Sequence, residues 1–212
     1  MTVIHSEFAT IATKLTSLGL TELVLLQAIK CGILARQECT ANHPPIYAGI
    51  TAWANTVRGL REQLIPLNWT RSDEGNYPLV IHPSGSIAIA LATGDENTGS
   101  IEANPMTKYS KGPNTQAMVS LNQMTLFQDM QSSETNFNSD ADARLTWLLL
   151  VARVGNTVKA ELSLPINCDG KVNAWRERII LPNIDIDPTV DIFATPIVPN
   201  MPDIEIDVQR KA

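Results

Sequence analysis

The chain has 212 residues, of which 44% are hydrophobic and 18% are charged. This share of apolar residues supports a folded core and excludes a chain that is disordered throughout. The formal charge is −6, whereas proteins that coat nucleic acid through phosphate contacts are usually basic, so the charge balance argues against that class.

Cysteine and histidine are few and scattered. The three cysteines form no CxxC pair, which indicates a reducing compartment and no disulfide framework. The three histidines are separated by 38 and 39 residues, with no cysteine cluster beside them, so we expect no metal site and no cofactor. The first residues lack a basic stretch followed by an apolar one, and no apolar run is long enough to span a bilayer. We therefore expect a cytoplasmic protein without membrane contact.

Residues 1–66 are predicted to be helical. In the first helix apolar residues recur at helical spacing up to Gly19, where the helix is expected to end or to bend. Thr21 is expected to cap a second, largely apolar helix over 21–38. A third helix over 50–65 carries its apolar residues on one stripe: Ile50, Trp53, Ala54, Val57, Leu60 and Leu64.

Short runs rich in β-branched and other apolar residues, bounded by turn residues, occupy 67–92 and 145–182 and predict antiparallel strands. Residues 73–76 are expected to form a turn in the first group, and Gly155-Asn156 a hairpin in the second. Between the two groups, the apolar spacing over 115–130 fits a helix better than a strand.

Two patterns predict which side chains face the core. After the Gly155-Asn156 hairpin, polar residues alternate with apolar ones, which predicts a solvated face carrying Lys159, Glu161 and Ser163. Four tryptophans lie beside apolar runs and are expected in the core: Trp53, Trp69, Trp147 and Trp175.

The expected architecture is an α+β fold, in which an N-terminal helical layer packs on antiparallel β-strands. The helical region 1–66 and the β-rich region 67–182 are expected to form one domain. Residues 183–212 are rich in proline and acids, and are interpreted as an extended C-terminal arm that lies along the body or on a neighbour. The alternative is a disordered or loosely draped end, which is more common for such a tail than a binding element. Such an arm is able to add a strand to a partner or to a twin.

The polar stretch 93–115 holds the candidate ligand-binding residues Asp95, Glu96, Lys108 and Lys111. Carboxylates after a strand are suited to Mg²⁺, and lysines beside glycines are suited to phosphate. The spacing does not match a P-loop, which requires GxxxxGK[ST]. A solvated polar turn is the alternative, because Gly, Asn, Asp, Thr and Pro are also ordinary turn residues.

His82 and Ser84 lie two residues apart in the stretch VIHPSG. A triad with Asp95 is one interpretation, although the GxSxG elbow is absent. The other interpretation is a turn histidine that is hydrogen-bonded to backbone.

Five arginines are candidate partner-binding residues. Two helices followed by a hairpin have the order of a winged helix-turn-helix, with Arg58 and Arg61 on the last helix and Arg71 in the hairpin. The chain up to Arg71 carries six Lys or Arg against four Glu, a weakly basic balance that is compatible with duplex contact. Arg176 and Arg178 follow Trp175 and are expected to form a surface cluster together with Glu177.

The blocks ATGDENTG, KGPNT, ELSLP and WRERIILP resemble signature blocks of small uncharacterised accessory proteins of bacterial mobile elements and phage–host conflict regions, and the resemblance covers about residues 46–182. The resemblance implies a protein that binds a larger machine and assigns no catalytic residue. We therefore expect a non-enzymatic interaction protein that binds a protein or nucleoprotein partner, as an inhibitor or accessory subunit. The alternatives are a metal-dependent enzyme acting on a phosphate ester or nucleotide, and a winged-helix-like DNA-binding protein.

Overall fold

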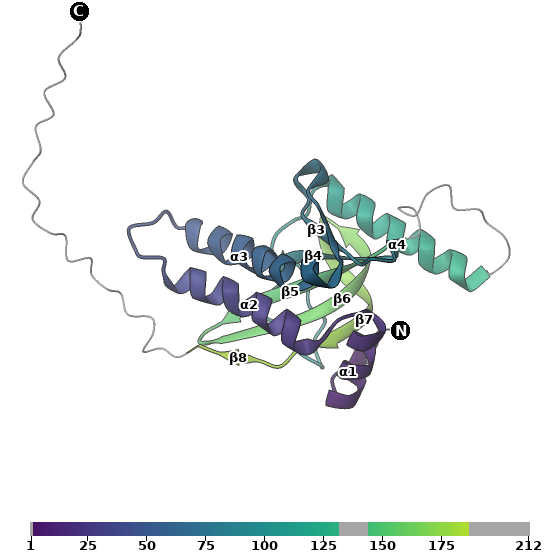
Figure 1. Ribbon diagram of the computed structural model, residues 1–212, viewed down its shortest axis with the longest axis horizontal. Coiled ribbons are helices and arrows are strands. Elements are labelled where there is room, and N and C mark those ends of the chain that lie inside the picture. The colour runs from purple at the N-terminus through teal and green to yellow at the C-terminus, as the bar shows by residue number, and fades with distance from the viewer. Residues whose placement is uncertain (1, 132–143, 187–212) are drawn as a thin grey trace, which may run out of the picture.

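The computed structural model describes residues 2–131 and 144–186, which form a mixed sheet covered by helices on both faces (Figure 1). The sheet runs in the order β1-β7-β6-β5-β4-β3-β2, and β8 pairs with β6 beside this path. Its strands are β1 Val3–His5, β2 Thr70–Ser72, β3 Leu79–Ile81, β4 Ile87–Thr93, β5 Leu145–Val154, β6 Thr157–Asp169, β7 Lys171–Ile180 and β8 Ile184–Asp185.

Three helices cover one face of the sheet and the fourth covers the other. The helices are α1 Phe8–Ser17, α2 Glu22–Gln37, α3 Tyr47–Leu64 and α4 Pro113–Gln131, and the 3-10 segments are Ile65–Leu67 and Glu74–Asn76. The larger core joins α1, α2 and α3 to residues such as Trp147 and Leu149 of β5. The second core joins Met118 and Val119 of α4 to the opposite sides of β4, β5 and β7. The predicted α+β class is confirmed.

Local sequence signals explain where the first helices end and begin. Gly19 adopts φ +69° after α1, and the N–H of Leu20 returns to the carbonyl of Leu15 at 2.9 Å, which satisfies a carbonyl of the last turn. The Thr21 hydroxyl accepts a hydrogen bond from the N–H of Val24 at 3.4 Å and so caps α2. The expected cap at Thr21 and the expected end of the first helix at Gly19 are therefore confirmed.

The sheet is mixed, which corrects the expectation of antiparallel strands alone. Strands β4 and β5 run parallel, with Ile87 opposite Leu145 and Thr93 opposite Val151. Parallel neighbours require a crossover connection, and the polar stretch followed by α4 provides it on the far face of the sheet. The expected hairpins are confirmed, since β2 pairs antiparallel with β3 and β5 with β6.

The first strand was not predicted from the sequence. β1 pairs in parallel with β7, with Val3 opposite Glu177, and the Thr2 hydroxyl donates to the Trp175 carbonyl at 2.8 Å. Lys14 of α1 reaches Glu177 from the same side, at 2.6 Å. The N-terminal segment is therefore held to the last long strand by backbone and side-chain contacts.

The described chain ends at Ile186, just after β8. Most of the predicted C-terminal arm, residues 187–212, lies outside the described residues. Within the described part, no single helix has the length and apolar composition needed to cross a bilayer, and the one pair that reaches that composition, α1 with α2, is bent by 91°.

Candidate functional site

The stretch between β4 and α4 is bound to the sheet along its length. Gly94 donates its N–H to Val151 at 3.0 Å, and Asp95 donates to Met106 at 3.0 Å. Further along, the N–H of Thr107 reaches Val172 at 3.0 Å, and the Val172 N–H returns to the Thr107 hydroxyl at 3.2 Å. We call residues 94–112 the covering loop, because it lies over the same face of the sheet as α4.

A buried ion pair anchors the covering loop. The Arg178 side chain is 2% exposed and that of Glu161 is fully buried, and the guanidinium meets the carboxylate at 2.6 and 3.0 Å. Arg178 also donates to the carbonyls of Ser100 and Ala103, and the Gly99 N–H donates to Glu161 at 2.8 Å. Loop and sheet therefore share one hydrogen-bond network.

This network corrects two expectations from the sequence. The alternating pattern predicted a solvated face for Glu161 and Ser163, yet both are buried beneath the covering loop, and the Ser163 hydroxyl donates to Glu161 at 2.7 Å. Arg178 was expected in a surface cluster beside Arg176. In the structure Arg176 is exposed and Arg178 points inward, where no partner can reach it.

An open cleft of about 1020 Å³ lies between helices α2 and α3 and the carboxyl ends of β4 and β5. It lies where β4 ends, because Thr93 is the last residue that pairs with β5, at Val151, while β5 continues to Val154. Its size lies at the upper end of the usual range for ligand pockets, about 300–1,000 Å³. We call it the helix–sheet cleft; its apolar lining includes Ile29, Ile33, Ile46, Ile50, Leu91, Val151, Val158 and Ile186.

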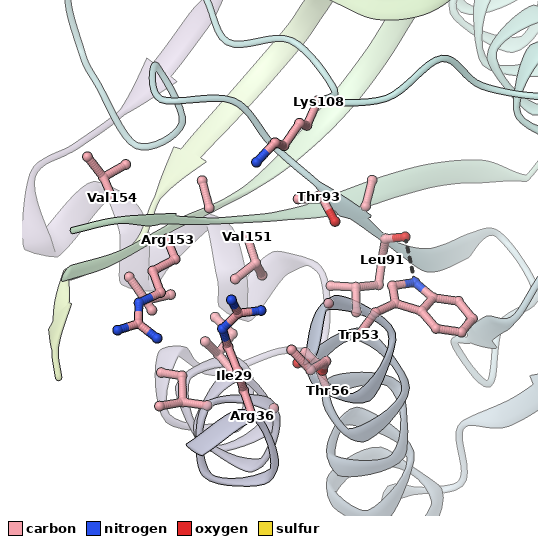
Figure 2. A pocket seen from close by; sticks show the side chains of 18 of the residues that line it. Ile29, Arg36, Trp53, Thr56, Leu91, Thr93, Lys108, Val151, Arg153 and Val154 are labelled. Atoms are coloured by element: carbon pink, nitrogen blue, oxygen red, sulfur yellow. Dashed lines mark hydrogen bonds between the residues drawn. The ribbon is translucent and has the colours of Figure 1, made fainter. Parts of the chain in front are cut away.

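The apolar stripe of α3 is only half covered by the core. Val57, Leu60 and Leu64 are buried, but Ile50 is 53% and Trp53 37% exposed along the cleft. The Trp53 indole donates to the Leu91 carbonyl at 3.4 Å, as Figure 2 shows. The expectation of a core position is therefore wrong for Trp53, although the other three tryptophans are buried. The N-terminal half of α3 presents an apolar surface to the cleft.

Charged side chains gather at the cleft from three directions (Figure 2). Arg36 of α2 and Arg153 of β5 point into the same end of it, and Lys108 enters from the covering loop. The Arg153 Nε donates to the Gly155 carbonyl at 3.0 Å. The side chain of Arg36 has no hydrogen bond or ion pair with any residue in 2–131 or 144–186.

The structure brings three of the four ligand-binding candidates to this cleft: Asp95, Glu96 and Lys108. Asp95 also forms a local turn, because its carboxylate accepts the Asn97 N–H at 3.2 Å. The Lys108 amine lies 5.8 Å from the centre of the Tyr109 ring, within cation–π range.

Lys111 lies away from the other three candidates, near the β6–β7 turn. Its N–H donates to the Gly170 carbonyl at 2.7 Å. Burial lowers the pKa of the Lys111 amine, and the nearby Cys168 opposes this shift. Burial likewise raises the pKa of the Cys168 thiol. The four candidates therefore do not form a single constellation.

The arginines of the winged-helix interpretation lie on α3 and the β2 edge. Arg58 is exposed beside Glu62 at 3.7 Å, and Arg71 is exposed on β2. Arg61 instead binds Asp73 at 2.6 Å, and this hydrogen bond holds the pKa of the Asp73 carboxyl below its ordinary value. The hairpin of β2 and β3 continues into the main sheet through β4, so it is not a separate wing.

His82 is part of a turn. Its Nδ1 accepts the Ser84 N–H at 3.1 Å and lies 2.8 Å from the Ser84 hydroxyl. Its ring packs edge-on to Trp69, with centres 4.9 Å apart. This agrees with the interpretation of a turn histidine bonded to backbone.

No group of three or more His, Cys, Asp or Glu side chains in the described ranges is placed to hold a metal ion. In comparisons with known proteins, no family model, no curated protein and no solved structure matches this chain. The functional argument therefore depends on the geometry of the helix–sheet cleft.

Sequence reasoning missed the cleft and two of its cations, Arg36 and Arg153. These residues come from distant segments that meet only in the fold. One signal was present in the sequence: the apolar stripe over 50–64 extends further toward the N-terminus of α3 than the core does. An apolar helix stripe longer than its partner surface indicates a binding face.

Proposed function

We propose that the protein is a non-enzymatic interaction protein that binds an apolar segment of a protein partner in the helix–sheet cleft. The observation that carries this proposal is the open apolar wall formed by the N-terminal half of α3. Ile46 is 70%, Ile50 53% and Trp53 37% exposed, and all three line the cleft. Contiguous exposed apolar surface of this kind is typical of protein interaction sites.

The lining of the cleft supports an apolar occupant. It brings together residues from the start of α3, the ends of β4 and β5, and Ile186 after β8, and the cleft is open to solvent. A partner side chain inserted beside Trp53 would be surrounded by Ile50 and Leu91, with charged groups at the rim. A desolvated apolar centre with a polar edge is the usual anatomy of a protein interface.

The structural roles of the covering loop also support a binding function. Asp95 closes a turn, and Gly99, Ser100 and Ala103 are bound by the buried ion pair. These contacts account for much of the unusual composition of the 93–115 stretch. We infer that the loop shapes one wall of the cleft.

The proposal is tested by site-specific photo-crosslinking in the host cell. The full chain carries p-benzoylphenylalanine at position 50, in the cleft, or at position 8, where Phe8 is 80% exposed on α1 away from the cleft. We expect position 50 to form an adduct with one defined segment of another protein, located by mass spectrometry. Position 8 should not form this adduct.

A peptide with the crosslinked sequence is then titrated into the purified full chain. Ile50→Glu and Trp53→Ala should weaken its affinity at least tenfold, since each removes an apolar contact at the centre of the interface. Phe8→Glu is the matched surface control and should leave the affinity unchanged. An affinity that is equal in all four proteins would refute the proposal.

A phosphate-ester enzyme is the second candidate, favoured by the placement of Asp95, Glu96 and Lys108 at one cleft. Thermal denaturation with Mg²⁺ or Mn²⁺, with and without nucleotides, separates the two functions. Stabilisation by metal and nucleotide together that disappears in Asp95→Ala, combined with turnover, would support the enzyme. An unchanged melting temperature in every mixture would leave the interaction protein as the better proposal.

A further inference from the structure

We propose that the chain's own C-terminal segment, residues 187–212, occupies the helix–sheet cleft of the same molecule when no partner is bound. This inference uses the binding site of the proposed function and names the chemistry of its occupant: an apolar segment with acidic residues. It predicts that a partner must displace this segment.

The described chain ends at the cleft. Ile186 is 5% exposed and is part of the cleft lining, and its N–H donates to the Asn156 carbonyl at 2.7 Å. β8 pairs with the start of β6, with Ile184 opposite Val158, which itself lines the cleft. The segment 187–212 is therefore joined to the fold directly after a residue that lines the cleft, and its 26 residues have more than enough length to reach across it.

The composition of the segment complements the cleft. Its apolar residues include Val190, Ile192, Phe193, Ile197 and Val198, which are suited to the exposed wall of α3. It carries five acids against two bases, and the acids Asp187 and Asp191 come first. Arg153 donates to the Gly155 carbonyl, next to Asn156, whose carbonyl accepts the Ile186 N–H, and Arg36 points into the same end of the cleft as Arg153 (Figure 2). The first acidic residues of the segment therefore follow the described chain at a point close to the two arginines, which favours an electrostatic attraction between segment and cleft.

The segment belongs to the same chain as the cleft, so weak contacts are sufficient for it to occupy the cleft. A binding segment joined to its site by a short linker has an effective concentration on the order of millimolar. An intrinsic affinity in the millimolar range then fills the cleft about half of the time. The four prolines in the segment also reduce the conformational entropy that binding must restrict.

The test uses the purified full chain with p-benzoylphenylalanine at position 50. We expect an internal crosslink to residues 187–212 in a product that runs as a monomer. The variant with Phe193→Ser and Ile197→Ser should lower the crosslink yield several-fold. Position 8 again serves as the control and should not crosslink to the segment.

A charge-reversal experiment separates recognition from damage to the fold. Arg36→Glu should lower the crosslink yield, and adding Asp187→Lys and Asp191→Lys should restore it. If Arg36 only stabilised the fold, changes in the segment would not restore the crosslink yield. Failure of the rescue, absence of the crosslink, an equal crosslink from position 8, or a crosslinked dimer that identifies a second copy as the occupant would each overturn the proposal.

The two proposals fail in different ways. If the partner adduct forms at position 50 but no crosslink to 187–212 does, the self-occupied cleft is wrong and the interaction protein stands. If the segment crosslinks but neither the wild type nor the Phe193→Ser, Ile197→Ser variant binds a partner, the interaction protein is wrong and the self-occupied cleft stands.

Discussion

Arg178 and Glu161 form a bidentate ion pair between β7 and β6 in which both side chains are almost fully buried. Burying two charges is costly unless each finds further hydrogen bonds. Both do so here, because Arg178 also binds two carbonyls of the covering loop and Glu161 accepts the Gly99 N–H. The pair therefore connects the covering loop to the sheet.

Arg178→Met is expected to destabilise the protein by about 3–5 kcal/mol, because it leaves the Glu161 carboxylate buried without its partner. The double variant Glu161→Gln, Arg178→Met removes that charge and should recover more than about 1 kcal/mol. It should remain less stable than wild type, since the Ser100 and Ala103 carbonyls still lack their donor. Urea denaturation measures the free energy of unfolding of wild type, of the single variant and of the double variant.

Arg176→Met is the control for this series, because Arg176 is exposed on the same strand. Its free energy of unfolding should stay within about 0.5 kcal/mol of wild type. A double variant as unstable as Arg178→Met would show that the isolated charge is not the cause.

Gly32 allows α2 and α3 to approach closely at the base of the cleft. A Cβ at this position would collide with the Thr56 hydroxyl and lie 2.6 Å from the Ala52 carbonyl. Gly32→Ala should therefore destabilise the protein by roughly 1–3 kcal/mol through overpacking. Thermal and urea denaturation report the change.

Gly49 on α3 is the control for Gly32, because the same substitution to alanine is not expected to cause a collision there. A Cβ there meets no atom within 4 Å, so Gly49→Ala should stabilise the helix by roughly 0.5–1 kcal/mol. Equal effects of the two substitutions would contradict the close packing of α2 on α3.

Local signals predicted much of the helical layer and the hairpins. Thr21 caps its helix and Gly19 ends the one before it, because each acts through backbone groups a few residues away. The Gly155-Asn156 hairpin was also predictable from local sequence, because Gly155 adopts the positive φ that such a turn requires.

The features that were missed depend on contacts between distant segments. The three residues of β1 are too few to give a recognisable strand pattern in the sequence. β1 is a strand because it pairs with β7. Glu161 looked solvent-facing because alternation shows which residues share a face and not what covers that face. The cleft was missed for the same reason, as α2, α3 and β5 meet there only after folding.

Asn122 is a second buried polar contact, and it joins α4 to the sheet. Its amide donates to the Thr146 and Pro165 carbonyls at 2.9 and 3.1 Å and accepts the Thr146 N–H at 2.8 Å. Asn122→Ala leaves these backbone groups buried without partners, so we expect a loss of roughly 2–4 kcal/mol. The exposed Met124→Ala on the same helix is the control for loss of side-chain volume, and a similar loss there would contradict this assignment.

Tyr77 predicts a specific response to alkaline pH. Burial raises the pKa of its hydroxyl to about 12 from the ordinary value of 10. The unfolded chain therefore releases this proton first, and the associated stability is complete below pH 10 and is lost as the pH rises through about 12. At pH 11 the loss amounts to about 1.4 kcal/mol.

Urea denaturation at pH 8 and pH 11 measures this difference. Wild type should lose about 1.4 kcal/mol more than Tyr77→Phe between the two values. Tyr109→Phe, which changes an exposed side chain, is the matched control. Identical pH dependence in wild type and Tyr77→Phe would refute the assignment.

The pairing of β1 with β7 has a consequence for how the chain folds. Thr2 and Trp175 are bonded although 173 residues separate them. Contacts of such long sequence separation slow folding, because a large loop must close before they form. On a ribosome, the first strand would emerge long before the strand that pairs with it, so that border of the sheet is completed only after β7 has been synthesised.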